Sequence, residues 1–259
     1  MKRIIFFIFS ICVIISSYAQ SASELCETGR KAYLNGNYEE ALVYLQKAAD
    51  MGSPQACGLL GIGYMYGEFG GVQDLSTAFK WAGKGYTLSL DNPDPISIGV
   101  LGVLGTALAD SNKKWVENLN LLEYAYSHDF SPSYIGNLIS TCYLLKGDKI
   151  KAKEWANKIL DKEADAEDRD DYYMASAIIA KILMDSGDYF NAMDASRDAA
   201  SYGNPLALYV MGRCQIEMDV FPQIGKQRVK NAALYDYSPV ADIKAFDAEI
   251  QKYYNSIKN

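Results

Sequence analysis

An internal repeat constrains the fold of this chain more than any other feature. Residues 36–61 align without a gap on residues 187–212, at a constant offset of 151, and nine of the aligned positions are identical. The identical residues are small, turn-forming or aromatic: Gly36/Gly187, Tyr38/Tyr189, Ala41/Ala192, Ala48/Ala199, Ala49/Ala200, Gly52/Gly203, Pro54/Pro205, Ala56/Ala207 and Gly61/Gly212. A repeat of this size predicts helical hairpins that stack, because one hairpin cannot bury its apolar face alone.

The repeated residues have a local physical logic. Gly36 and Gly52 are expected to end helices, because glycine enters the left-handed conformation without steric penalty. Pro54 is expected in the first turn of the next helix, where its missing N–H is not needed.

Two families share this pattern. Residues 34–52 resemble the second half of a tetratricopeptide repeat, through Gly36, Tyr38, Ala41, Leu45 and Ala48. Residues 54–85 resemble a Sel-like repeat, in which a helix, a Gly-Val loop and a second helix follow in order. The matching positions are Ala56, Leu60, Gly61, Tyr64, Met65, Tyr66, Gly67, Gly71, Val72, Asp74, Ala78 and Trp81. The resemblance implies that Gly61, and Gly212 at the equivalent place, lie where helices of neighbouring units press together.

The resemblance implies an all-α fold, a right-handed α-solenoid of stacked antiparallel helix pairs in one domain from residue 20 to 259. Repeats are expected at residues 22–53, 54–90, 95–130, 131–166, 168–204 and 205–237, with Trp115 to Tyr126 as one helix of the third pair. The loop from Met218 to Pro222 departs from the Gly-Val form. An amphipathic helix over residues 239–257 is expected to cap the C-terminal end.

The first 19 residues predict export. Lys2 and Arg3 precede an apolar run that ends before small residues at Ala19, which is the pattern of a cleaved secretory signal peptide. The run is shorter than the roughly 20 residues that a transmembrane helix needs, so we expect no membrane insertion after cleavage. The predicted location is periplasmic or extracellular.

Charge and cysteine spacing exclude further classes. Loss of Lys2 and Arg3 would change the formal net charge from −7 to −9, which opposes binding to nucleic acid. Four cysteines lie in the mature chain without a CxxC spacing: Cys26, Cys57, Cys142 and Cys214. Buried free thiols are the preferred interpretation, although a bridge between Cys26 and Cys57 remains open. No metal site or cofactor is expected.

Three possible catalytic or metal-binding patterns are weak. His128 is the only histidine and is interpreted as a turn residue. Ser111 to Lys114 match S-x-x-K without the accompanying motifs of penicillin-recognising enzymes, so Ser111 is expected to be a helix N-cap. The acidic residues 161–171 lack EF-hand spacing. The sequence contains no catalytic constellation, and we expect no enzyme activity.

The expected function is a scaffold or adaptor that binds a protein or peptide in a concave groove. In tetratricopeptide-like repeats the first helix of each pair lines that groove. Transferred to this sequence, the resemblance nominates ten residues: Gln55, Gly58, Ile62, Met65, Tyr66, Leu206, Tyr209, Arg213, Ile216 and Glu217. The alternatives are a glycan- or peptidoglycan-binding envelope module, which the 20 tyrosines could serve, and a cell-wall hydrolase.

Overall fold

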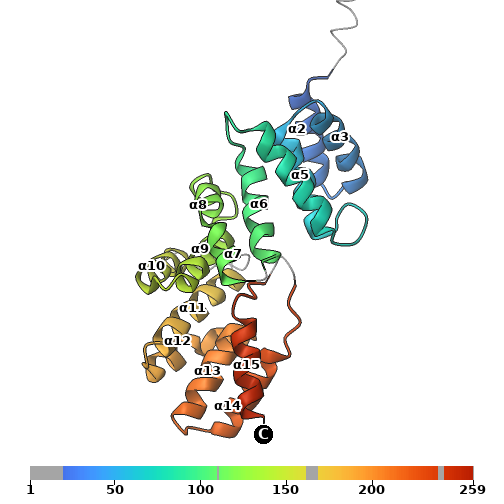
Figure 1. Cartoon of the computed structure of the whole chain (residues 1–259). Helices are drawn as coiled ribbons and strands as arrows, with labels where there is room; N and C mark the ends of the chain where they lie inside the picture. Colours follow the sequence, from blue (N-terminus) through green and yellow to red (C-terminus); the bar gives the residue numbers. More distant parts are fainter. Residues whose placement is uncertain (1–19, 110, 162–168, 239–241, 259) are drawn as a thin grey trace, which may run out of the picture. The chain divides into compact units, whose positions relative to one another are not determined.

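The structure, a computed structural model, describes residues 20–109, 111–161, 169–238 and 242–258. The predicted signal peptide and most of the acidic segment 161–171 lie outside these ranges. Within them all regular secondary structure is α-helical (Figure 1), which confirms the predicted all-α repeat fold. The chain contacts divide into two compact units, one ending at Ser97 and one starting at Ile98. We describe each by itself, and the single solenoid domain stays a prediction.

Unit 1 contains two helical hairpins. Helices α2 (Ala22–Leu34) and α3 (Tyr38–Asp50) form the first, and α4 (Pro54–Tyr66) and α5 (Leu75–Leu88) form the second. Leu45 is fully buried between α2 and α3. A Cβ at Gly29 would lie 2.7 Å from the Leu45 Cγ atom, so this glycine allows the two helices to approach closely.

Unit 2 holds the remaining helices in chain order: α6 (Pro95–Ala107, which begins in unit 1), α7 (Asn112–Glu117), α8 (Leu119–Ser127), α9 (Pro132–Leu145), α10 (Lys149–Leu160), α11 (Arg169–Met184), α12 (Tyr189–Tyr202), α13 (Pro205–Glu217), α14 (Pro222–Ala233) and α15 (Asp247–Ile257). From α9 to α14, each helix packs on the next one along the chain. Asn137 of α9 is buried and donates from Nδ2 to the Asp171 carbonyl oxygen at 2.9 Å, which links α9 to α11.

The repeated glycines and prolines form the corners between helices, as predicted. Gly52 and Gly203 have φ angles of +88° and +102°, and Gly36 and Gly187 have +76° and +82°. Pro54 and Pro205 are the first residues of α4 and α13. The side chain before each proline caps the helix. The Ser53 hydroxyl accepts from the Ala56 backbone N–H at 3.2 Å, and the Asn204 side-chain oxygen accepts from the Ala207 backbone N–H at 3.0 Å.

The Sel-like loop after α4 folds back onto the hairpins of unit 1. Phe69 is buried, and its ring meets the edges of Tyr33 and Tyr64 at centroid distances of 5.9 and 5.6 Å. The ring also lies directly over Gly63, where a Cβ would overlap it. The neighbouring Glu68 accepts a hydrogen bond from the Tyr33 hydroxyl. This loop is therefore part of the core of unit 1.

The third pair differs from the prediction in its second helix. The segment expected as one helix from Trp115 to Tyr126 is divided at Asn118 into α7 and α8. Asn118 donates from Nδ2 to the Lys114 carbonyl oxygen at 2.7 Å, and its side chain occupies the space beside Gly105 of α6. The break lets the Asn118 side chain fill the groove that this glycine leaves.

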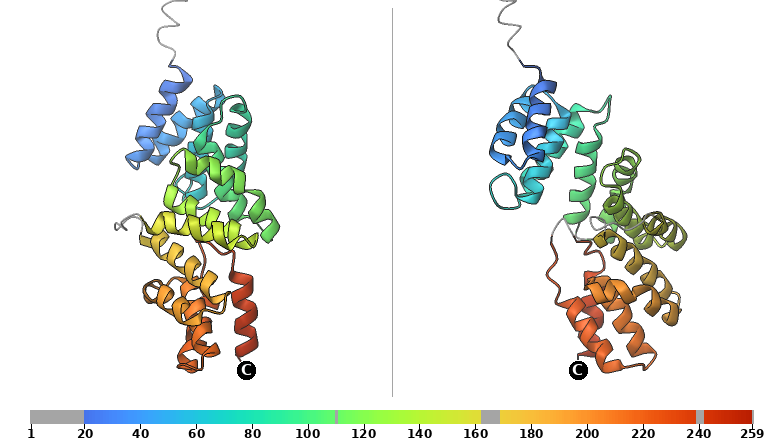
Figure 2. Two further views of the ribbon diagram at one scale, coloured as in Figure 1. Left: turned by 90° about the vertical axis from the view of Figure 1, so that its left-hand side faces the viewer. Right: turned by 180° about the vertical axis from the view of Figure 1, so that it is seen from behind.

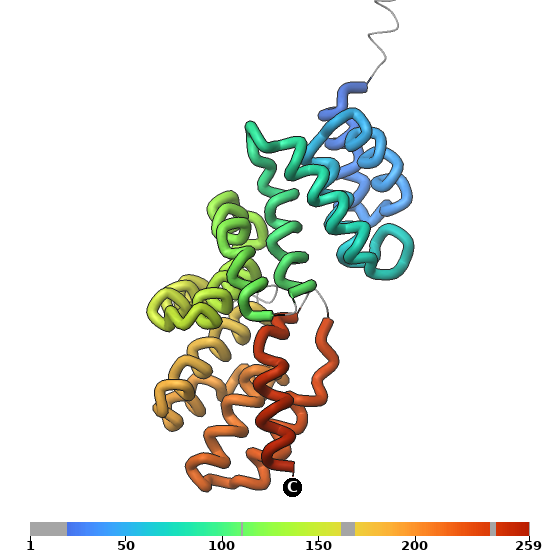
Figure 3. The backbone as a smooth tube through the Cα atoms, viewed as in Figure 1, coloured from blue at the N-terminus to red at the C-terminus, as the bar shows by residue number. Residues whose placement is uncertain are grey.

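The C-terminal helix is shorter than predicted. Of the expected range 239–257, residues 239–241 lie outside the described part, residues 242–246 are not helical, and α15 begins at Asp247. It packs on α14, as a capping helix would. In unit 2 its side chains also reach α13 and α11, beside which it is drawn in Figures 2 and 3.

Candidate functional site

On α4, the five nominated groove residues do not share one exposed surface. Gln55 and Tyr66 are exposed, and Ile62 is half-buried. Gly58 and Met65 are buried, so the expectation that they contact a partner is wrong. The physical reason is that the start of α6 covers Gly58 closely enough to exclude a Cβ.

On α13, Tyr209, Arg213 and Glu217 of the five nominated residues contact α15. Leu206 and Tyr209 are buried, at 3% and 0% exposure, so the prediction that they line an open groove is wrong. Arg213 and Ile216 are half-buried, and Glu217 is exposed at the end of the helix. The contacts of Tyr209, Arg213 and Glu217 with α15 could not be predicted from sequence periodicity.

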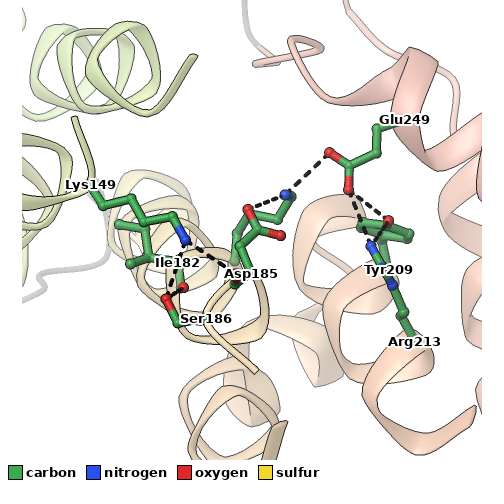
Figure 4. Close-up of polar contacts among 8 residues, drawn as sticks. Lys149, Ile182, Asp185, Ser186, Tyr209, Arg213 and Glu249 are labelled. Atoms are coloured by element: carbon green, nitrogen blue, oxygen red, sulfur yellow. Dashed lines mark hydrogen bonds and ion pairs between the residues drawn. The ribbon is translucent and has the colours of Figure 1, made fainter. Parts of the chain in front are cut away.

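Glu249 of α15 is the centre of this contact (Figure 4). One oxygen, Oε1, accepts from the Tyr209 hydroxyl at 2.8 Å and lies 3.5 Å from Nη1 of Arg213. The other, Oε2, lies 3.2 Å from Nζ of Lys181 on α11. One carboxylate thus joins two cations from two first helices. The Glu249 side chain is 40% exposed, so solvent screens these ion pairs to about 0.2–1 kcal/mol each, and Glu249 orients α15 on α11 and α13.

Both cations also have a carboxylate four residues further along the chain. Lys181 is buried and lies 2.6 Å from Oδ2 of Asp185, the residue after the end of α11. Arg213 lies 3.8 Å from Oε1 of Glu217, one turn further along α13. Lys149 of α10 adds a further link, since its Nζ donates to the Asp185 carbonyl oxygen at 3.2 Å. A buried cation without a partner is strongly destabilising, and these pairs prevent it.

Aromatic and apolar side chains complete the contact. The Arg213 guanidinium lies 4.9 Å from the centre of the Tyr253 ring, a cation–π geometry. The Tyr253 hydroxyl donates to Glu217 at 3.3 Å. Phe246 just before the helix is 5% exposed, and its ring centre lies 5.7 Å from Nζ of Lys181. Ile250 is fully buried on α15, which packs on α14. The contact of α15 with α11 and α13 therefore combines charged and aromatic groups.

The tyrosine hydroxyls in this contact have shifted pKa values. Burial, followed by the negative charge of Glu249, raises the pKa of Tyr209. Burial and the nearby Glu217 raise the pKa of Tyr253 to about 12. Both hydroxyls are protonated at neutral pH, so they act as hydrogen-bond donors to the carboxylates.

We refer to the surface of α11 and α13 beneath α15 as the α11–α13 face. It consists of Lys181, Asp185, Tyr209, Arg213 and Glu217, and all five belong to unit 2. It has paired charges and an aromatic residue, and the buried Phe246 ring lies beside Lys181. Chemically, it is suited to hold an amphipathic helix that presents a carboxylate.

A second concave surface in unit 2 is a pocket of about 510 Å³ at the first turns of α11 and α13. Tyrosines and aspartates dominate its lining: Tyr134, Tyr173, Tyr202, Tyr235, Asp170, Asp171 and Asp242. The rings of Tyr173 and Tyr202 lie 4.6 Å apart. We call it the tyrosine–aspartate pocket. The nominated residues include none of its lining, although the abundance of tyrosine was the signal that pointed to it.

The other singled-out residues have structural surroundings. His128 is exposed, stacks on Tyr124 at 4.2 Å and lies with Nδ1 2.9 Å from the Tyr124 carbonyl oxygen. Ser111 precedes α7 as predicted, but its side chain makes no capping hydrogen bond. Cys26, Cys57, Cys142 and Cys214 are buried free thiols, as the preferred interpretation expected. Across the described ranges, no group of three or more His, Cys, Asp or Glu residues is arranged to hold a metal.

The helical hairpins with glycine and proline corners have a counterpart among solved structures. A monomeric mutant of IFIT1 with m7Gppp-AAAA matches 90% of this chain and 56% of its own at a TM-score of 0.51 and 14% identity. The chain thus spans little more than half of that protein. The chain shares its all-helical fold with that protein.

Two further structures match the chain at lower TM-scores. A Sel1 repeat protein from Oxalobacter formigenes matches 90% of this chain and 98% of its own, with a TM-score of 0.47 and 20% identity. The tetratricopeptide domain of P58(IPK) matches 92% of this chain and 67% of its own, with a TM-score of 0.41 and 12% identity. No protein-family model and no curated protein sequence matches the chain. None of the described helices is long and apolar enough to cross a lipid bilayer.

Proposed function

We propose that this protein is an exported scaffold that binds a protein partner through a helical segment laid along the α11–α13 face. The observation that carries the proposal is that this face already holds a helix, α15, through Glu249, Tyr253 and, just before the helix, Phe246. Amphipathic helices in grooves are a common mode of peptide recognition. The formal charge of −9 after signal cleavage opposes a phosphate backbone as the partner.

In-cell photo-crosslinking tests this proposal. A photoreactive amino acid at position 217, on the edge of the α11–α13 face, is expected to crosslink to one protein partner in the cell envelope. The same amino acid at position 190 is the matched control, because Phe190 is 74% exposed on α12 and lies on the second helix of its pair. Crosslinking only from position 190, or from neither position, contradicts the proposal.

The tyrosine–aspartate pocket favours glycan binding as a second candidate function. Tyrosine rings offer flat apolar faces with polar tips, and ionised aspartates accept hydrogen bonds from hydroxyl groups. A volume of about 510 Å³ lies in the range of small-ligand pockets. Soluble peptidoglycan fragments are expected to bind the wild-type chain, and Tyr202→Ala to weaken that binding without changing crosslinking from position 217.

A further inference from the structure

The α11–α13 face is electrostatically complete without α15. Lys181 retains Asp185, just after the end of α11, at 2.6 Å, and Arg213 retains Glu217 of the same helix at 3.8 Å. Removal of Glu249 therefore leaves neither cation alone, which avoids the large penalty of an unpaired buried charge. The face can persist when its own helix leaves.

The fit of α15 to this face is incomplete. Nε of Arg213 is buried and has no hydrogen-bond acceptor, and the 3.8 Å separation from Glu217 is too long for a hydrogen bond. A cavity of about 300 Å³ also lies beside Phe246 and Glu249, against the ends of α9 and α11. An occupant with a further acceptor and more apolar volume would make contacts that α15 does not.

The helix itself is held by few buried groups. It has 11 residues, of which Ile250 alone is buried, and Ile243 and Phe246 are buried in the segment before it. Helices of this length are marginal on their own in water, so α15 is helical because it is docked. Its release would expose a small apolar area.

From these contacts we infer that α15 is an exchangeable occupant, which a partner helix of the same chemistry displaces. This inference rests on the proposed function and names the partner's chemistry. The partner presents a carboxylate to Lys181 and Arg213, an aliphatic residue next to it, and aromatic residues about one turn to either side. These positions correspond to Glu249, Ile250, Phe246 and Tyr253. Until such a helix competes, α15 covers the α11–α13 face.

Exchange can be measured with the helix itself as the probe. A fluorescent synthetic peptide of residues 242–258 is titrated against the mature chain and against a Glu249→Lys, Ile250→Asp double variant. These substitutions place a cation beside Lys181 and Arg213 and a charge in an apolar site, so they release the tethered helix. Tethering gives an effective concentration on the order of millimolar. The peptide is therefore expected to bind the double variant at least about tenfold more tightly than wild type.

Two controls define the outcome. Lys252→Glu changes a charge on an exposed residue of the same helix and is expected to behave as wild type. A probe peptide with Glu249→Lys is expected not to bind. Hydrogen exchange should show fast exchange of α15 in the double variant, with α11 and α13 still protected. Equal peptide affinities for all chains, absent binding, a double variant with α15 still protected, or loss of protection in α11 and α13 would each overturn the inference.

The crosslink from position 217 separates this inference from the proposed function. If exchange holds, the partner crosslinks more strongly to the double variant than to wild type. Equal crosslinking of both chains retains the scaffold and rejects the exchange. Peptide exchange without any crosslinked partner retains the exchange and rejects the scaffold.

Discussion

Single glycines set the spacing between paired helices. Gly212 of α13 and Gly225 of α14 face each other, and a Cβ on either would lie 2.6 Å from the carbonyl oxygen of the other. Gly212 was expected at a contact between neighbouring units, but it packs within its own hairpin. The reason is that the backbones of α13 and α14 approach each other most closely at these two glycines.

Replacement of this glycine is expected to separate the hairpin. Gly212→Val should lower the free energy of unfolding by about 1–3 kcal/mol, because the obstructing atom is backbone and cannot rotate away. Gly83→Ala is the control, since a Cβ there meets nothing within 4 Å and alanine favours a helix by about 0.5–1 kcal/mol. Urea unfolding measures both. A neutral Gly212→Val would show that the hairpin adapts.

The buried thiols predict a loss of stability at alkaline pH. Burial raises the pKa of Cys142 to about 12, whereas an unfolded thiol has a pKa near 8.5. Between these values the unfolded chain binds fewer protons than the native chain. Its stability therefore falls as pH rises from about 8.5, by up to about 1.4 kcal/mol per pH unit for each such thiol. Below pH 8 this contribution is fully present.

Unfolding in urea between pH 7.5 and 10.5, with reductant present, measures this slope. Cys142→Ala should make the slope of stability against pH shallower by about the contribution of one thiol. This holds whatever the substitution does to the free energy of unfolding at pH 7.5. The remaining slope comes from the other buried thiols, Cys26, Cys57 and Cys214, whose pKa values burial also raises. Above about pH 9.5, tyrosines with raised pKa values such as Tyr143 and Tyr253 add to it. An unchanged slope would mean that the native state ionises Cys142 as easily as the unfolded chain does.

At this scale, sequence alone predicted the residues whose role depends on local geometry. Gly52 and Pro54 took the predicted conformations because a left-handed corner and a helix start impose them locally. The exposure of Tyr209 could not be predicted in this way. It depends on a helix 40 positions later in the chain that docks over it, and periodicity assigns a residue to a face without saying what covers that face.

Among the elements, the loop of residues 67–74 is the clearest case of a connection that acts as core. Phe69→Ala should destabilise unit 1 by about 3 kcal/mol, because it removes a buried ring that fills the space over Gly63. Phe79→Ala is the matched control, since Phe79 is 46% exposed on α5. Hydrogen exchange should rise in α2 and α4 only for Phe69→Ala. Equal effects of both substitutions would contradict this role.

Helix pairing was predictable because apolar periods of three and four residues recur along the chain, but the ends and breaks of helices were not all predictable. Asn118 divides the segment of α7 and α8 through a side-chain contact to the preceding turn and to α6. Nothing in the periodicity of Trp115 to Tyr126 marks that break. Similarly, α15 begins at Asp247, although the amphipathic pattern extends further toward the N-terminus.

For the whole molecule, the prediction concerns export. The mature protein is expected to begin at or near Gln20, because the apolar run ends at the small residues before it. N-terminal sequencing of the protein purified from the cell envelope measures this. Replacement of Ile8 and Ile11 by Asp should keep the chain in the cytoplasm with Met1 retained, and a cleaved, exported variant would contradict the prediction.

Export would give the four free thiols a kinetic significance. In an oxidising compartment a native chain hides Cys26, Cys57, Cys142 and Cys214 from small oxidants, but an unfolded chain exposes all of them to disulfide formation. Any disulfide between these cysteines would trap the chain in a non-native state, because all four are free thiols in the native fold. Unfolding in air should then become irreversible and depend on heating rate. The same protein with reductant should refold on cooling, so its lifetime outside the cell would depend on how rarely it opens.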